Sequence, residues 1–510
     1  MACPDPIRCD LLVIGGGING AGIARDAAGR GLAVVLCEQD DLASHTSSAS
    51  TKLIHGGLRY LEQYEFALVR KALREREVLL RSAPHILWPL RFIMPHLASQ
   101  RPAWLIRSGL FLYDHLARRA LLPASESLSL AGHAAGHGLQ AHYSRGFAYS
   151  DGWVDDARLV VLCAQAAASS GARILTRHRV EHLHPHADGW RVHAVQRHGH
   201  SQAFQARAVV NASGPWLTRL PGIPHPSGRR LRLVKGSHIV VPRLFGHDHA
   251  YLFQQPDERV VFAIPYEQRF TLIGTTDVDH HADPAQVCVS PDEVEYLCAA
   301  VNRFITQRIS PADVVWQFAG VRPLLDDAHA SASQVTRDYQ LVWQPDRPPL
   351  LHVFGGKLTT FRQLAEDAMT LLCPRLGLDD RPWTRQACLP GGDNLLAAGP
   401  HVRNVLHFPD WVRQQRERYP WLPPPLLQRY ARTYGSRLHT LLANCQSLGD
   451  LGPAILPGLH EREVLYLQHH EWARTADDIL WRRTKLGLHL GPQATGTLDR
   501  WLAESPEPRH

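Results

Sequence analysis

The feature of this 510-residue chain that most restricts its fold is a glycine-rich turn between two apolar runs near the N-terminus. The first run, Asp10–Ile14, is typical of a buried parallel strand. It leads directly into G-G-G-I-N-G, which contains the spacing G-x-G-x-x-G, and an alanine-rich segment of helical character follows. A second apolar run, Ala33–Cys37, ends on Glu38. This order predicts a strand–helix–strand unit with parallel strands.

Each part of this unit has a purpose in binding a dinucleotide. Gly15 allows the tight turn, Gly17 lets the backbone approach a pyrophosphate, and Gly20 permits close contact between helix and strand. The first N–H groups of the helix then face the phosphates, and Glu38 can accept hydrogen bonds from ribose hydroxyls. Because the acid accompanies the glycines, we predict a dinucleotide site and not merely a glycine-rich turn between packed elements.

Two other segments indicate which dinucleotide is bound. The polar stretch Asp40–Lys52 is rich in Ser and Thr, whose hydroxyls and backbone amides can line a long cofactor. Far downstream, the apolar run that begins at Ala208 ends on Ser213 and Gly214, which leave space beside it. A glycine motif at the N-terminus that distant segments complete is the usual arrangement of FAD-binding chains. We therefore favour FAD over NAD.

The chain is basic, with a formal net charge of +7 and 55 lysines and arginines, of which only five are lysines. This charge permits an anionic partner, such as a phosphorylated substrate or an acidic membrane surface. We expect no nucleic-acid partner, because neither an interleaved basic–aromatic surface nor a helix-turn-helix spacing is evident.

Length and residue usage set further limits. A chain of 510 residues exceeds one ordinary core, so we expect two or three domains. The nine cysteines form no C-x-x-C pair, which indicates reduced thiols. The histidines are scattered, or adjacent as in His280–His281 and His469–His470, so we expect no metal site.

No run of about 18 apolar residues occurs, so no membrane span is expected, and the early first strand leaves no room for a signal peptide.

Several further segments resemble those of a single enzyme family. They are Thr46–Glu62 (T-S-S-A-S-T-K-L-I-H-G-G-L-R-Y-L-E), Val234–Val241 (V-K-G-S-H-I-V-V), Ile273–Asp277 (I-G-T-T-D), Gly320–Leu324 (G-V-R-P-L), Thr336–Tyr339 (T-R-D-Y), Phe354–Thr360 (F-G-G-K-L-T-T) and Arg474–Gly487 (R-T-A-D-D-I-L-W-R-R-T-K-L-G). Together they resemble the FAD-dependent glycerol-3-phosphate dehydrogenases of the aerobic bacterial type, in the same order and over nearly the whole chain.

The resemblance implies an α/β fold. Its parts would be a Rossmann-like FAD-binding domain of the glutathione-reductase or amino-acid-oxidase kind, a substrate domain with a mixed sheet, and an all-helical C-terminal cap. We expect the FAD-binding domain in residues 1–80, 145–235 and 345–390, the substrate domain in 81–144 and 236–344, and the cap in 391–510.

The resemblance also implies a reaction. It is the oxidation of sn-glycerol 3-phosphate to dihydroxyacetone phosphate, with hydride transfer to FAD and electrons passed on to a membrane quinone. The enzyme would be a homodimer bound peripherally to the cytoplasmic face of the bacterial membrane, in contact with anionic lipid. Two alternatives stay open, namely an oxygen-using glycerol-3-phosphate oxidase and another FAD-dependent amine or hydroxy-acid oxidoreductase of the same fold.

A dianionic phosphate calls for guanidinium groups, whose planar fork binds phosphate oxygens in pairs. Arg322 and Arg337 lie in segments that the family uses beside its substrate, and Arg59, followed by Tyr60, is a third candidate. Lys357 is also expected at the substrate.

The few lysines suggest sites that need a compact ammonium group. Lys357 is expected near the flavin, where its charge would stabilise the reduced ring, and Lys52 is expected in cofactor binding or structural hydrogen bonding. On the motifs and the resemblance together, we expect the cofactor at Gly15, Gly17, Ile18, Asn19, Gly20, Glu38, Thr46, Ser47, Ser50, Lys52, Val180, Ser213, Gly214, Gly356, Lys357, Leu358 and Thr359.

The proton of the substrate's C2 hydroxyl needs an acceptor, and imidazole titrates near neutrality. His238 opens a short apolar run after Gly236 and Ser237, a position from which a side chain can project from a sheet toward a ligand. We expect His238 in this role, with His55 as the alternative.

The stretches 88–96 and 101–116 mix arginines with Trp, Phe, Leu and Ile, as an anchor in a lipid interface requires. The alternative is an amphipathic helix packed on the substrate domain, with arginines that extend to water. We expect membrane contact.

Overall fold

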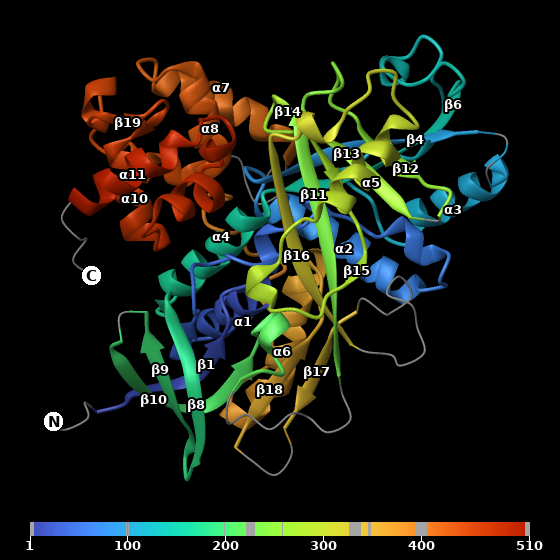
Figure 1. Ribbon diagram of the computed structural model, residues 1–510. Coiled ribbons are helices and arrows are strands. Elements are labelled where there is room, and N and C mark those ends of the chain that lie inside the picture. Colours follow the sequence, from blue (N-terminus) through green and yellow to red (C-terminus); the bar gives the residue numbers. More distant parts are fainter. Residues whose placement is uncertain are drawn as a thin grey trace.

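The computed structural model describes residues 5–97, 99, 101–197, 199–220, 230–257, 259–325, 338–344, 348–393 and 405–504. Two large β-sheets with helices around them make up most of the chain, and a mainly helical part follows at the C-terminal end (Figure 1). Among the described residues, no helix is long and apolar enough to cross a membrane.

The first sheet has a parallel centre in the order β18-β10-β1-β2-β7, with antiparallel strands added at the β18 and β10 positions. Its strands are β1 (Ile7–Ile14), β2 (Val34–Cys37), β7 (Arg173–Leu175), β8 (His178–His186), β9 (Gly189–Gln196), β10 (Ser201–Asn211), β17 (Gln340–Trp343) and β18 (Leu350–Phe354). The helices that pack on it are α1 (Ile18–Gly29), α4 (Asp156–Ser169) and α6 (Phe361–Leu376).

Small residues let α1 approach the strand that precedes it. A Cβ atom at Gly20 would overlap the carbonyl oxygen of Gly15, so no other residue fits there. Buried alanines, among them Ala21, Ala24 and Ala28, continue the contact along α1. The glycine turn is thereby fixed against the carboxyl end of β1, at the edge of the sheet where open α/β folds bind ligands.

The second sheet is mixed. Its order is β15-β11-β14-β13-β12-β4-β6-β3, with β16 paired to β11 and β5 to β6. The strands are β3 (Leu53–Ile54), β4 (Leu87–His96), β5 (Glu126–Ser129), β6 (Arg145–Val154), β11 (Leu231–Pro242), β12 (Ala250–Gln254), β13 (Val260–Tyr266), β14 (Phe270–Gly274), β15 (Val278–Asp279) and β16 (Trp316–Leu325). Helices α2 (Phe66–Ser82), α3 (Ala103–His115) and α5 (Pro291–Asn302) lie around it, and β11 and β16 extend toward the first sheet (Figure 1).

One expected membrane segment is wrong. Residues 88–96 form most of β4, which pairs with β6 along its whole length and with β12 on its other side. Phe92, Ile93 and Met94 are buried there. Because Leu90 and these three side chains belong to buried hydrophobic clusters of the second sheet, they do not face lipid.

The C-terminal part has its own core, to which Trp411, Tyr430 and Leu467 contribute. It consists of α7 (Phe408–Arg418), α8 (Pro424–Tyr434), α9 (Leu438–Leu441), α10 (Glu461–Glu471), a π-helix (Asp478–Arg483), α11 (Gln493–Glu504) and the short hairpin β19 (Ala454–Leu456) and β20 (Leu459–His460). The predicted fold class is confirmed, with this hairpin as an addition to the helical cap.

Strand pairing departs from the expected domain boundaries at three places. β3 (Leu53–Ile54) pairs with β6 in the second sheet, although we expected residues 1–80 with the FAD-binding part. β6 (Arg145–Val154) belongs to the second sheet, although we expected residues 145–235 with the FAD-binding part. Conversely, Gln340–Trp343 pairs with β18 of the first sheet. The sheet that a strand joins depends on the strand with which it pairs, and the sequence of a single segment does not identify that partner. Elsewhere the expected division into domains stays a prediction.

The turn between α2 and β4 buries a histidine, His85, completely. Neither ring nitrogen has a hydrogen-bond partner among the described residues. Burial, together with the charges of Arg158 and Arg432, holds the pKa of this imidazole well below its usual 6.5. His85 is therefore neutral in the folded protein.

This buried histidine predicts a loss of stability in mild acid. Below pH 6.5 the unfolded chain takes up a proton at His85 that the folded chain does not, so the free energy of unfolding falls by about 1.4 kcal/mol per pH unit. We expect His85→Gln to make the melting temperature less sensitive to pH below about 6.5. The exposed control His142→Gln should leave that sensitivity unchanged. Equal pH slopes for wild type and His85→Gln would contradict the prediction.

Candidate active site

A cavity of about 400 Å³ lies where the two sheets meet, and segments from many parts of the chain line it. One wall is formed by the glycine turn, the loop that follows β2 and the end of β10. A second group of lining residues comes from β11, β16, the segment that follows β14 (Thr275 and Asp277), and residues within 55–60 and 355–359. The cavity therefore joins the predicted dinucleotide site to the predicted substrate residues.

The glycine turn fits a pyrophosphate. Gly15 has a positive φ of 107°, and a Cβ atom there would lie 2.6 Å from the carbonyl oxygen of Ala212. The helix α1 begins after Gly17, which offers no side chain to cap it. Of the first N–H groups, that of Ile18 donates to Ser47 Oγ at 3.0 Å. Uncapped amides at a helix N-terminus bind phosphate oxygens, and the wall of the cavity supplies them here.

Glu38 lies at the end of β2, where a ribose-binding acid is expected. Its carboxylate accepts the N–H of Gly16 at 2.6 Å and that of Asp40 at 2.8 Å. Burial raises the pKa of Glu38, whereas these two amides oppose the rise. Each oxygen keeps acceptor capacity for a hydroxyl group, so the residue fits the ribose of a dinucleotide.

Most of the expected cofactor residues line this cavity. They are Gly15, Gly17, Ile18, Asn19, Glu38, Thr46, Ser47, Ser50, Ser213, Gly214, Gly356, Lys357, Leu358 and Thr359. Some of their polar groups are already paired: Thr46 Oγ1 donates to the carbonyl of Val321 at 2.7 Å, and Ser50 Oγ to Asp156 at 2.7 Å. These two hydrogen bonds hold residues of the cavity wall in place.

Three expected cofactor residues do not line the cavity. Gly20 packs α1 on β1, as described above, and Val180 on β8 belongs to a buried hydrophobic cluster of the first sheet. Lys52 is fully buried and its Nζ atom donates to Asp156 at 2.8 Å and to the carbonyl of Ser48 at 3.1 Å. Lys52 thus forms a buried structural ion pair with Asp156, at the start of α4, and does not reach the cavity.

Arg322 on β16 is the best-placed cation for an anionic substrate. Its guanidinium pairs with Asp277 and donates to Thr275 Oγ1 at 3.0 Å, and the side chain lines the cavity half-buried. Gly236, on the neighbouring strand β11, makes room for it, since a Cβ atom there would overlap the guanidinium. The fork is therefore held in one orientation before any ligand binds.

His238 lies two residues further along β11, on the same face as Gly236. The ring stacks on Phe318 with centroids 4.8 Å apart, and Nε2 shares a hydrogen bond with Thr51 Oγ1 at 3.0 Å. Burial lowers its pKa well below the usual value, and the charges of Arg322 and Lys52 lower it further. The imidazole is consequently neutral and can accept a proton.

The remaining expected residues reach the same cavity from segments other than β11. His55, Arg59, Tyr60 and Lys357 all line it, and Lys357 Nζ lies 3.8 Å from the centre of the Tyr60 ring. The N–H of His55 donates to Thr359 Oγ1 at 3.2 Å, which ties the two segments together. Arg337 lies outside the described residues.

Sequence reasoning missed several acids and aromatics of the cavity. Asp277 closes the motif I-G-T-T-D, so its place could have been anticipated. Asp151 on β6 gave no such signal. Its buried carboxylate binds Arg76 at 2.5 Å and Tyr113 at 2.9 Å, and burial raises its pKa. Trp216, Tyr149 and Phe262 are further lining residues.

The fold and the cavity define a class, the dinucleotide-dependent oxidoreductases, and comparison with known proteins narrows it. A family model described as FAD dependent oxidoreductase matches residues 10–362, and one described as C-terminal domain of alpha-glycerophosphate oxidase matches residues 383–504. A glycerol-3-phosphate dehydrogenase of Pseudomonas aeruginosa is 51% identical over 97% of this chain and 94% of its own length. D-erythritol 1-phosphate dehydrogenase of Brucella abortus is 49% identical over 98% of both chains.

Among solved structures, the glycerol-3-phosphate dehydrogenase of Bacillus halodurans complexed with FAD matches with a TM-score of 0.78 at 28% identity, covering 98% of this chain and 90% of that chain. The chain belongs to the bacterial FAD-dependent glycerol-3-phosphate dehydrogenases, within the FAD-dependent oxidoreductases. The predictions of the family, of an enzyme and of FAD as its cofactor are confirmed.

Proposed function

We propose that this enzyme oxidises sn-glycerol 3-phosphate to dihydroxyacetone phosphate in an FAD-dependent reaction. One observation carries the proposal: Arg322, held ready by Asp277 and Thr275, lines the same cavity as the glycine turn. A carboxylate or amine substrate would not require further cations beside it, yet Arg59 and Lys357 line this cavity as well. The relatives described above, which are glycerol-3-phosphate dehydrogenases, support the same substrate.

In this proposal the cations hold the phosphate. The fork of Arg322 offers paired donors to phosphate oxygens, and Arg59 and Lys357, which line the same cavity, add positive charge. Arg337 stays a proposed fourth member. Three cations in one small cavity bind a dianion far more strongly than an uncharged molecule, so free glycerol should be a poor substrate.

The remaining residues accept the proton of the substrate's C2 hydroxyl and stabilise charge on the cofactor. When bound, FAD supplies the two-electron oxidant that alcohol oxidation requires. His238 is proposed to accept the proton of the C2 hydroxyl, because its neutral imidazole lines the cavity on the same sheet face as Arg322. His55 is the alternative acceptor. Lys357 places a positive charge beside Tyr60, where it favours negative charge on the cofactor.

The similarity to D-erythritol 1-phosphate dehydrogenase supports a second candidate substrate, a longer polyol phosphate. Both compounds carry a phosphate for Arg322 and differ in the length of the carbon chain. Steady-state kcat/KM values for glycerol 3-phosphate and D-erythritol 1-phosphate, with ketone product measured, decide between them. We expect the shorter substrate to be preferred, and a higher kcat/KM for the erythritol ester would reverse the assignment.

The electron acceptor is proposed to be a membrane quinone. The resemblance to the aerobic bacterial enzymes supports this choice, whereas the match to a domain of alpha-glycerophosphate oxidase keeps oxygen as the competing acceptor. Turnover under air with a soluble quinone analogue, with hydrogen peroxide measured in parallel, separates them. Peroxide in amounts equal to the ketone product would assign the enzyme to the oxidases.

Contact with anionic lipid on the cytoplasmic side of the membrane is proposed for α3. On this helix Trp104 is 70% exposed and Phe111 58%, and Leu105 and Leu112 are also exposed. Their spacing places them on one side of the helix. Arg107 does not take part, because it donates to Ser125. A homodimer is proposed on the resemblance alone.

Removing the apolar side of α3 should weaken lipid binding. The double variant Trp104→Ser/Phe111→Ser should bind vesicles that contain anionic lipid at least about tenfold more weakly, since each aromatic contributes about 2 kcal/mol when buried. The matched control is Val315→Ser/Leu406→Ser, whose side chains are 51% and 54% exposed elsewhere. Co-sedimentation measures both, and equal binding by the α3 variant and wild type would contradict the assignment.

A further inference from the structure

The loop between β2 and β3, residues 38–52, forms much of the cofactor side of the cavity, and we call it the cofactor loop. It supplies Glu38, Thr46, Ser47 and Ser50 to the lining. Apart from one short turn, Thr46–Ser48, it has no regular secondary structure. Its conformation must therefore be held by contacts with other parts of the chain.

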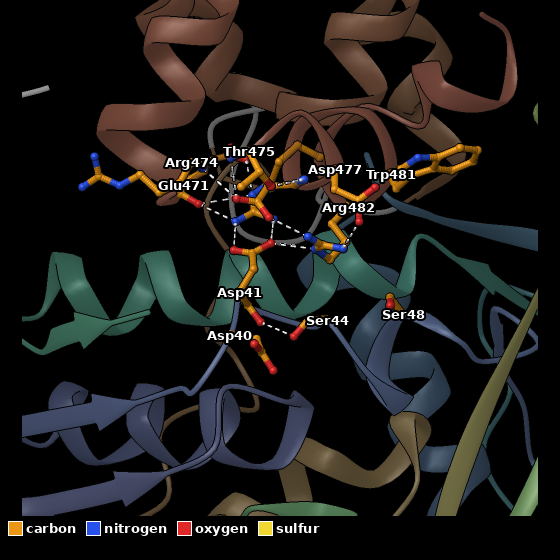
Figure 2. A network of polar contacts seen from close by, with 12 residues as sticks. Asp40, Asp41, Ser44, Ser48, Glu471, Arg474, Thr475, Asp477, Trp481 and Arg482 are labelled. Atoms are coloured by element: carbon orange, nitrogen blue, oxygen red, sulfur yellow. Dashed lines mark hydrogen bonds and ion pairs between the residues drawn. The ribbon is translucent and has the colours of Figure 1, made fainter. Parts of the chain in front are cut away.

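The strongest of these contacts centre on Asp41, which is only 2% exposed. Its carboxylate accepts Arg482 Nε at 2.7 Å and both Nη atoms of Arg483 at 2.8 Å. Figure 2 shows Asp41 extending from the loop into the C-terminal part, where these partners lie. Charge-assisted hydrogen bonds of this kind are about twice as strong as neutral ones.

The two arginines are themselves fixed. Arg483 also donates to the carbonyl of Glu471, at 2.6 Å from Nη2, and Arg482 donates to Asp478 at 2.5 Å. Asp478 accepts the N–H groups of Arg474 and Thr475 at 2.7 and 3.0 Å. The π-helix thus presents both guanidinium groups as a rigid pair, and Figure 2 shows this network above the loop.

On its other side, Asp41 is connected to the cofactor site. Its carbonyl accepts the N–H and the Oγ–H of Ser44, at 3.2 and 2.7 Å. Ala43, two residues after Asp41, donates its N–H to the carbonyl of Gly16 in the glycine turn at 3.2 Å. Displacement of Asp41 would therefore move residues that line the cavity on both the loop and the turn.

We propose that Asp41 is a positioning residue through which the C-terminal part of the chain, by Arg482 and Arg483, holds the cofactor loop in the conformation that binds FAD. FAD binding and docking of residues 471–485 are then coupled, and the coupling acts equally in both directions. This inference goes beyond the oxidation reaction, and FAD binding measures it whatever the substrate.

The first test measures FAD release. Asp41→Asn removes one charge and leaves two buried guanidinium groups without it, at little change in volume. After dilution of the yellow holoprotein, free-FAD fluorescence should rise at least about fivefold faster than in wild type, the low end of measured couplings between sites. The conservative variant Arg483→Lys, which loses the fork, should show a smaller increase.

A matched control separates coupling from general destabilisation. Glu463 is a buried carboxylate of the C-terminal part, paired with Arg429 at 2.6 and 2.7 Å, and among the described residues it forms no hydrogen bond or ion pair with the cofactor loop. Glu463→Gln should lower the melting temperature without accelerating FAD release. Wild-type release from Asp41→Asn, or equally fast release from Glu463→Gln, would overturn the proposal.

A second measurement needs no variant and decides the matter if Asp41→Asn does not fold. Backbone hydrogen exchange is compared for the wild-type chain with FAD bound and after its removal by dialysis. Amides of residues 471–485 should exchange faster without FAD, whereas those of α8 should not change. Unchanged exchange in residues 471–485 would overturn the proposal.

Discussion

Replacing Arg322 with alanine should lower kcat/KM for glycerol 3-phosphate by about 10²-fold, since two charge-assisted hydrogen bonds of about 1.5 kcal/mol each are lost. The variant also leaves Asp277 in the cavity wall without its partner, which adds repulsion toward the phosphate. Steady-state kinetics measure the effect. FAD content should stay at the wild-type level, because Arg322 lies on β16 and not in the glycine turn or the cofactor loop.

Two further variants serve as comparisons for this prediction. Arg322→Lys keeps the charge and loses the fork, so it should recover only part of the activity. Arg173→Ala, which removes an exposed arginine of β7, should leave kcat/KM unchanged. If Arg322→Ala retains kcat/KM within about threefold of wild type, a span of about 0.7 kcal/mol, the phosphate does not bind at Arg322.

His238→Ala should lower kcat by about 10² or more while FAD stays bound, because removal of a positioned proton acceptor costs about 10²–10⁴ in rate. The ring is buried and contacts Thr51 and Phe318, so FAD content and the melting temperature of the variant are measured beside kcat. Stopped-flow measurement of flavin reduction under saturating substrate isolates the chemical step from product release.

The comparison with His55→Ala assigns the proton acceptor. The lowered pKa of His238 keeps it neutral as the pH falls through 6.5, so the acid limb of kcat should lie below pH 6.5. Near-wild-type kcat in His238→Ala, together with a loss of about 10² or more in His55→Ala, would transfer the role to His55.

The dinucleotide part was predictable because it is local in sequence. The glycine spacing, the small residues of α1 and Glu38 all lie within one strand–helix–strand unit, and each has a steric or hydrogen-bonding reason to be where it is. Arg322 and His238 were found through segments that resemble a known family. Their geometry depends on Gly236, whose purpose appears only when β11 and β16 are paired.

The failures of prediction share a different cause, which is long-range pairing. The apolar and basic residues of 88–96 suggested a lipid anchor, yet they form a strand that pairs with β6 and β12 inside the second sheet. Lys52 lies in a polar stretch that lines the cavity, but its own side chain turns to Asp156. Likewise, nothing near Asp41 in the sequence indicates that Arg483 is its partner, since the two are 442 positions apart.

Anaerobic mixing of the yellow holoprotein with glycerol 3-phosphate tests the central claim most directly. The visible absorbance of the oxidised flavin should disappear with glycerol 3-phosphate, and it should persist with glycerol and with lactate at the same concentration. An absorbance that persists with glycerol 3-phosphate, or that disappears equally with glycerol or lactate, would contradict the assignment of this cavity to a phosphorylated substrate.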